Sequence, residues 1–194
     1  MRIVNRSAVA TDVLRPYLEH GAAGIRDAGV LVVLADKADW SGRYSGYACW
    51  GVESRIRCAK LGVAQAEYTV ILKLRNAENC PARWHGQGLK WFDRRFPSGV
   101  PIESPVDYLV TLTAHEFRHV WQFRRAKAAM DGKARPRRLG ELDAEFWAVD
   151  RLSRFRVLTG RSPIEPAKQP VPAGLAKSRA ACAALSPSRK DRHV

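Results

Sequence analysis

The sequence predicts an α+β fold in which a small sheet, with strands in mixed or antiparallel directions, precedes two long helices. Three observations predict it. Short apolar or alternating runs typical of strands occur in the first half of the chain, and longer stretches with helical periodicity occur between residues 104 and 160. The length of 194 residues suits one domain with a sizeable core.

The first elements alternate between strand and helix. Residues 1–7 predict a short strand, and residues 11–29 have the pattern of a helix that stops near Gly29. The run VLVVLADKAD, residues 30–39, resembles a buried strand. Residues 40–51 are rich in glycine and aromatic side chains without a clear period, which favours a hairpin or a loop.

Residues 67–75 carry the clearest strand pattern. Tyr68, Val70, Leu72 and Leu74 alternate with mainly polar neighbours, which predicts a strand with one buried face. The polar second face favours a place at the edge of the sheet. This strand is then either an ordinary sheet strand or the edge strand that binds an extended substrate. Glycine and proline interrupt residues 76–103 and predict a long ordered loop near a site.

Two helices follow this loop. Ser104 can cap the first, because Pro105 suits its first position and Asp107 completes a capping box. The second covers residues 141–160 and stops at Gly160. A basic loop with glycine and proline joins them. We therefore expect a body of residues 1–160 and a basic Pro/Ala-rich C-terminal tail of residues 161–194.

The net charge of +14 is concentrated in two segments. Residues 124–138 contain seven basic and one acidic side chain, and residues 161–194 contain seven basic and two acidic side chains. Both segments suit either a solvated surface or attachment to a nucleic acid or another acidic partner. A dedicated nucleic-acid module would be expected to carry this charge on its folded body.

Location and redox state follow from what the sequence contains. The apolar runs fall short of the roughly 18 residues that cross a bilayer, and charged residues interrupt residues 12–19, where a secretory signal needs an apolar core. We expect a cytoplasmic protein without membrane partners. The four cysteines form no C-x-x-C pair, so reduced thiols are favoured over a structural zinc held by Cys49, Cys58, Cys80 and His85.

The motif HEFRH lies on the first of the two long helices. At about 100° per residue, His115 and His119 lie roughly 40° apart on one face, so both imidazoles can reach one ion. The alternative is that both are ordinary hydrogen-bonded helix residues. A catalytic zinc generally has three protein ligands and an open position for water, and no further histidine follows closely. The third ligand is therefore expected to be an acid.

The second helix offers four acids on two faces. Glu141 and Glu145 fall among apolar residues, whereas Asp143 and Asp150 lie on the polar side with Arg154. Carboxylates on a core face are costly unless they are paired. We assign Glu141 to the zinc and Glu145 to a hydrogen bond that orients a ligand histidine, and we expect Asp143 to leave metal binding unaffected.

With these residues in place, HEFRH followed by GELDAE resembles the gluzincin group of zinc metallopeptidases. Thermolysin-like members pair H-E-x-x-H with a downstream E-x-x-x-D, so the resemblance implies a small zincin-like domain. It also implies His115, His119 and Glu141 as zinc ligands, Glu116 as general base and Glu145 as the outer acid, where aspartate is usual. The run from residue 141 to 152 is similar to small regulatory gluzincins that act on DNA-binding repressors. The resemblance covers residues 104–152.

The predicted function is hydrolysis of a protein or peptide substrate by a zinc-activated water, with Glu116 accepting its proton. His85 and Tyr108 are the candidates for stabilising the oxyanion. The alternative is a basic nucleic-acid-binding protein with a structural or inactive metal site, in which residues 124–138 and the tail bind the partner.

Overall fold

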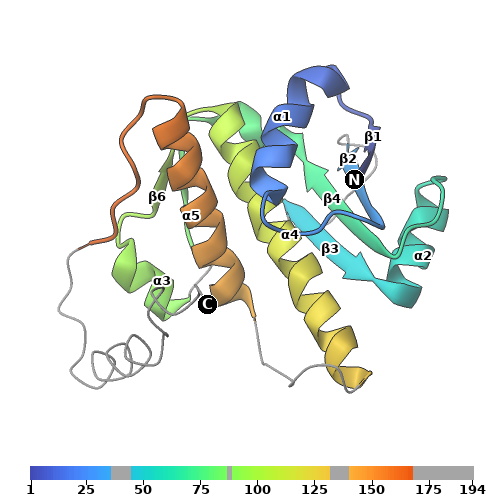
Figure 1. Cartoon of the computed structure of the whole chain (residues 1–194). Helices are drawn as coiled ribbons and strands as arrows, with labels where there is room; N and C mark the ends of the chain where they lie inside the picture. The colour runs from blue at the N-terminus through green and yellow to red at the C-terminus, as the bar shows by residue number, and fades with distance from the viewer. Residues whose placement is uncertain (36–44, 87–88, 132–139, 168–194) are drawn as a thin grey trace, which may run out of the picture.

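The computed structural model describes residues 1–35, 45–86, 89–131 and 140–167 (Figure 1). Its fold is α+β, with a four-stranded mixed sheet in the order β1 (Arg2–Asn5), β2 (Val30–Ala35), β4 (Tyr68–Lys73), β3 (Gly46–Trp50). The first three strands are parallel and β3 runs antiparallel to β4. The predicted fold class is therefore confirmed at the level of an α+β domain with a small mixed sheet.

Helices cover both faces of the sheet. On one face lie α1 (Thr11–Ala22), α4 (Pro105–Met130) and α5 (Glu141–Leu158), and Figure 1 shows α4 running the length of the molecule with α5 alongside. The other face is covered by α2 (Gly51–Lys60). Strand β2 supplies both layers, because alternate residues point to opposite faces: Val30, Val32 and Leu34 join the larger core, and Leu31 and Val33 join the smaller one.

A small antiparallel hairpin lies beside the helices, built from β5 (Ala82–Trp84) and β6 (Val100–Ile102). A 3-10 helix (Leu74–Asn79) and α3 (Lys90–Arg95) flank it. The predicted long loop thus contains four short ordered elements. None of the described helices combines the length and the apolar character needed to cross a bilayer.

The predicted edge position of β4 is wrong. Strand β4 lies between β2 and β3, and its second face is buried as well. Thr69 is polar, but its hydroxyl hydrogen-bonds with the Ser54 hydroxyl of α2 at 2.6 Å. Ile71 packs with Cys58 and Leu61 at the same interface. The sequence did not reveal α2, and without it this face resembled one that meets solvent.

Helix α4 begins as predicted and ends later than predicted. The Ser104 hydroxyl accepts a hydrogen bond from the Asp107 backbone N–H at 3.1 Å, which is the expected cap. The helix continues to Met130, into the predicted basic loop. Part of the basic segment 124–138 is therefore fixed on the body, where Lys127 pairs with Glu67 at 2.6 Å. Residues 132–139 lie outside the described residues.

The first residues of the predicted tail pack on the body. Asp107 is completely buried at the start of α4, and Arg161 donates two hydrogen bonds to its carboxylate, at 2.7 and 2.9 Å. The Ile164 N–H donates to the Ser153 hydroxyl, and the Ala167 N–H donates to the Arg95 carbonyl. Residues 161–167 therefore belong to the folded body, and residues 168–194 of the predicted tail lie outside the described residues.

We expect Arg161→Gln to destabilise the domain by roughly 2–3 kcal/mol, since it leaves the buried Asp107 carboxylate with the Glu103 backbone N–H but without its positively charged partner. Loss of one member of a fully buried pair costs about 3–5 kcal/mol, and the expected value is lower because the Arg161 side chain is 29% exposed. Urea denaturation measures the change. Arg154→Gln breaks an exposed pair with Asp150 and should cost about 0.5 kcal/mol or less. Equal stability of the two variants would contradict the anchoring role of Arg161.

Candidate metal centre

The three predicted ligands meet where α4 and the first turn of α5 touch. His115 Nε2 and His119 Nε2 lie 3.1 Å apart. Glu141 Oε2 lies 3.2 Å from the first and 3.4 Å from the second. Within the described residues, these side chains form the one group of histidine, cysteine or acidic residues that could hold a metal ion. A spacing of one helical turn on α4 and a tertiary contact to α5 thus produce a compact triangle of donor atoms.

The dimensions of this triangle fit a small tetrahedral cation. Zinc binds histidine nitrogen and carboxylate oxygen at about 2.0–2.1 Å, and a tetrahedron with such bonds has edges of about 3.3–3.4 Å. The three observed edges of 3.1, 3.2 and 3.4 Å are close to that length. Two imidazoles and one carboxylate are also a donor set that zinc accepts.

A hydrogen-bond network fixes which nitrogen of His119 faces the triangle. The side-chain amide of Gln122 donates to the Gly140 carbonyl at 3.2 Å and to Asp143 Oδ2 at 3.1 Å. Its oxygen is therefore left to accept from His119 Nδ1 at 3.0 Å. With the proton on Nδ1, the lone pair of Nε2 points at His115 and Glu141, as a metal ligand requires.

Asp143 belongs to this network, so its predicted place on the remote polar side is wrong. Arg118 donates to both of its oxygens, at 2.7 and 3.0 Å. The Arg118 guanidinium in turn lies over the ring of Trp121 at 3.8 Å and over that of Trp147 at 4.7 Å. Trp121 and Trp147 therefore position Arg118, which binds Asp143. Asp143 in turn accepts a hydrogen bond from Gln122, the partner of the ligand histidine.

We expect Asp143→Asn to weaken zinc binding by up to roughly 10-fold, the lower end of the effect of losing a hydrogen-bond partner of a metal ligand, because Asp143 acts on His119 through Gln122. The amide offers one acceptor oxygen where the carboxylate accepts three hydrogen bonds from Arg118 and Gln122, so the orientation of Gln122 is held less firmly. Competition with a chromogenic chelator measures the affinity. Asp150→Asn removes an acid of the same helix that pairs with Arg154 on the surface and should bind zinc as the parent does. Parent-like affinity of Asp143→Asn would show that the network has no influence.

Glu145 lies beside the other histidine, but the predicted hydrogen bond to it is not formed. Its side chain is 2% exposed, and Oε1 lies 3.8 Å from His115 Nδ1, an ion-pair distance rather than a hydrogen bond. The Trp84 indole N–H donates to the second oxygen, Oε2. The Trp84 ring also packs on His115, with the ring centroids 6.0 Å apart. Trp84 thus supports both His115 and its acid, a role that nothing in the sequence indicated.

Glu141 and Glu145 differ in exposure, contrary to the prediction that both face the core. The Glu141 side chain is 64% exposed because it belongs to the first residue of α5. It is therefore accessible to solvent on the side away from the histidines. Only Glu145 is a buried carboxylate of the kind that the helical pattern predicted.

The charges around the triangle favour a cation. Burial opposes protonation of His115, but the carboxylates of Glu141 and Glu145 outweigh it and raise the pKa of His115 to about 10. Burial also lowers the pKa of His119, but the carboxylates of Glu141 and Glu116 together outweigh it and raise that pKa. Hydrogen bonds from both imidazoles hold the pKa of Glu141 well below its usual range. Positive charge is therefore strongly stabilised here, whether protons or a metal ion supply it.

Glu116 is buried beside the triangle and faces the sheet. Burial raises the pKa of its carboxyl group to about 6, against the opposing charges of His115 and His119. A methyl group at Gly46 would lie 2.8 Å from Cγ and 2.9 Å from Cδ of Glu116, which is closer than ordinary contact. Glycine at this position of β3 therefore provides the space that the Glu116 side chain occupies.

The other candidates from the sequence lie elsewhere. His85 is exposed and lies against Gly99, and Tyr108 is buried with its ring packed on Trp84. Neither side chain belongs to the triangle. Cys49, Cys58 and Cys80 are free thiols, and no cysteine joins a metal-binding group in the described parts of the chain. Cys182 lies outside the described residues.

No family model, curated protein or solved structure matches this chain. We therefore infer a function from the geometry of the triangle and of the groups around it.

Proposed function

We propose that this chain is a zinc-dependent peptidase with a zincin-like arrangement, in which His115, His119 and Glu141 hold the ion. One observation carries the proposal: three lone-pair donors from two helices converge with tetrahedral spacing. Gln122 hydrogen-bonds His119 on the side away from the triangle, as a metal ligand needs, and the Glu145 carboxylate lies 3.8 Å from His115 Nδ1. When bound, zinc supplies a Lewis acid that activates water and polarises a carbonyl group.

In this proposal Glu116 moves the proton. Its carboxylate is next to the ligand histidines in the sequence, but it is not one of the three donors. Burial raises the pKa of its carboxyl group, which makes Glu116 a better proton acceptor than an exposed glutamate. Glu116 therefore takes a proton from the attacking water on a carboxylate oxygen and delivers it to the leaving amine. Burial keeps bulk water from competing for that proton.

Strand β3 replaces β4 as the proposed site for the substrate backbone. Ser45 O accepts from Lys73 N, and Gly51 N donates to Glu67 O. Backbone groups in an antiparallel pair alternate in direction, so those of Gly46, Ala48 and Trp50 point away from β4. Within the described residues β3 pairs only with β4. Its free edge is next to Glu116, and an extended peptide can add there as a further strand.

We expect Ala48→Pro to raise KM for a peptide by about 2- to 10-fold, the effect of losing one hydrogen bond. Proline removes an N–H on the free edge and leaves the bonds to β4 intact, a position where strands accept proline. Ala48→Val keeps the N–H while adding similar bulk, so it separates hydrogen bonding from packing. Peptide kinetics and zinc content test both variants. A larger KM in Ala48→Val than in Ala48→Pro would refute binding along β3.

Metal analysis combined with a cleavage assay tests the function. We expect one zinc per purified chain, cleavage of an unstructured peptide, loss of cleavage in a chelator, and recovery when zinc is restored. A chain that binds zinc stoichiometrically but cleaves none of a diverse peptide library would refute the peptidase proposal and leave a structural metal site.

A further inference from the structure

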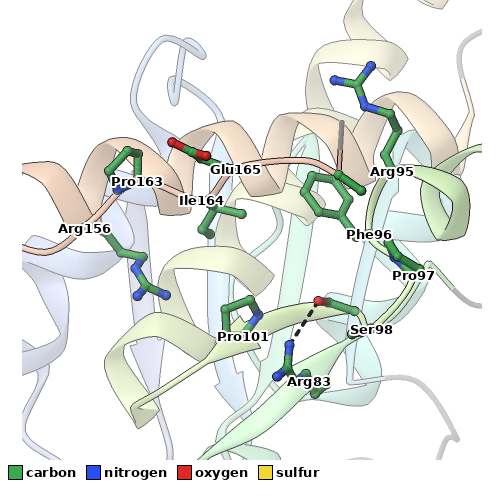
Figure 2. A pocket seen from close by; sticks show the side chains of 12 residues that line it. Arg83, Arg95, Phe96, Pro97, Ser98, Pro101, Arg156, Pro163, Ile164 and Glu165 are labelled. Atoms are coloured by element: carbon green, nitrogen blue, oxygen red, sulfur yellow. Dashed lines mark hydrogen bonds between the residues drawn. The ribbon is translucent and has the colours of Figure 1, made fainter. Parts of the chain in front are cut away.

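A cavity lies beside the β5–β6 hairpin, separate from the metal triangle. Its volume is about 310 Å³, and it lies between the hairpin, the end of α3, the end of α5 and residues 163–167 (Figure 2). It shares no lining residue with the metal triangle. Adjacent residues of β5 face the two sites, because Trp84 contacts Glu145 while Arg83 lines the cavity.

Three arginines and one glutamate line this cavity. Arg156 is the most buried of these four residues, with an exposed fraction of 8%. Its Nε donates to the Ser162 carbonyl and its Nη2 donates to Glu103 Oε1, but its Nη1 is buried and has no partner among the described residues. A buried N–H without an acceptor is costly, particularly on a charged group. Within the described part of the chain, a side chain that lines this cavity therefore has a donor without an acceptor.

Arg83 supplies a second positive group to the same cavity. Figure 2 shows Arg83 and Arg156 on either side of Pro101, with the Glu165 carboxylate turned to the opposite side of the view. The hydrogen bond that Arg83 Nη1 donates to the Gly99 carbonyl is long, at 3.4 Å. Arg95 also lines the cavity, but its guanidinium points away from the other two in this view. The remaining wall is largely apolar and includes Phe96, Pro97, Pro101, Pro163 and Ile164.

We propose that this cavity binds a small oxyanion, a carboxylate or a phosphate, attached to an apolar group. Planar guanidinium groups donate parallel hydrogen bonds to such anions. Arg156 Nη1 would gain the acceptor that it lacks, Arg83 would add charge at the mouth, and the proline and phenylalanine side chains would contact the apolar part. The site is independent of the metal triangle, and it does not require the chain to be a peptidase.

The test follows the Ile164 methyl group by NMR in the full-length chain, with Ile164→Val used to assign the signal. The probes are inorganic phosphate, N-acetylleucine and the uncharged N-acetylleucine amide, at an ionic strength kept constant with sodium chloride. We expect a saturable shift with at least one anion and none with the amide. A stronger response to phosphate identifies a phosphorylated ligand, whereas a stronger response to N-acetylleucine identifies a carboxylate.

Variants distinguish anion binding at this cavity from nonspecific attraction of anions to a basic chain. Arg83→Gln should weaken binding at least about tenfold, since hydrogen bonds to charged groups are strong, and Arg156→Lys should do the same while keeping the buried charge. Arg15→Gln removes an equal charge from α1, outside the cavity, and should bind as the parent does. Glu141→Gln should also bind normally, which distinguishes this site from the metal triangle. An Ile164 signal that ignores both anions, or equal weakening by Arg15→Gln, would overturn the proposal.

Discussion

Replacing Glu141 with glutamine should leave the purified chain with almost no zinc. The carboxylate is the only negatively charged member of the triangle, and its Oε2 lies within 3.4 Å of both imidazole nitrogens. The neutral amide keeps the shape but loses the charge that favours a cation. Loss of a direct ligand should exceed the roughly 10- to 100-fold effect of outer hydrogen-bond partners. Of all the changes considered, this one should have the largest effect on metal content.

Because Glu141 is exposed, a loss of zinc in this variant can be assigned to the lost ligand. Its side chain is 64% exposed in the first turn of α5, so glutamine fits the same space, and the metal-free chain loses only the contacts of this carboxylate with His115 and His119. Elemental analysis after dialysis measures the metal, and urea denaturation in excess chelator compares the folds. Asp150→Asn changes another exposed acid of the same helix and should retain zinc. If Glu141→Gln kept one zinc per chain, the proposed ligand set would be wrong.

Glu116→Gln should retain zinc and thermal stability while peptide turnover falls at least about 100-fold, the scale for losing a positioned general base. Glutamine fills the same space against Gly46 but cannot accept the proton at pH 7. Burial favours the neutral side chain, since it already raises the pKa of Glu116. The variant should therefore fold at least as well as the parent.

Turnover of a fluorogenic peptide and zinc content, measured on the same preparations, test this expectation. Glu19→Gln on the exposed side of α1 makes the same chemical change far from the site in sequence and should be as active as the parent. Active-site titration and a second purification step exclude a contaminating protease. Undiminished cleavage by Glu116→Gln would falsify the assignment of Glu116 as base.

Local sequence patterns predicted the parts of the fold and site that depend on local structure. Ser104 and Pro105 marked the start of α4, and the spacing of four residues placed His115 and His119 on one face. The choice of Glu141 over its neighbours also matches the geometry, since it completes the triangle. Each of these features follows from helix geometry within one or two turns.

Features that depend on long-range contacts could not be predicted in the same way. The polar residues of β4 indicated an exposed edge, but Thr69 is satisfied by Ser54 of a helix that the sequence did not reveal. Asp143 looked remote on a helical wheel, but Arg118 from α4 reaches across to it. The spacing of three residues between His119 and Gln122 was the one local signal for that network. Polar patterns show which side chains need partners, not where the partners are.

The division of the ligands between α4 and α5 means that an ion held by all three fastens two helices together. A ligand that binds the folded chain and not the unfolded chain shifts folding by mass action, adding about 4 kcal/mol at a free concentration about 1,000 times its Kd. That is a large share of the roughly 5–15 kcal/mol by which domains are stable. Metal supply in the cell would thus govern the lifetime of the protein against degradation. Selection for abundance alone would then preserve His115, His119 and Glu141, apart from any advantage gained by catalysis.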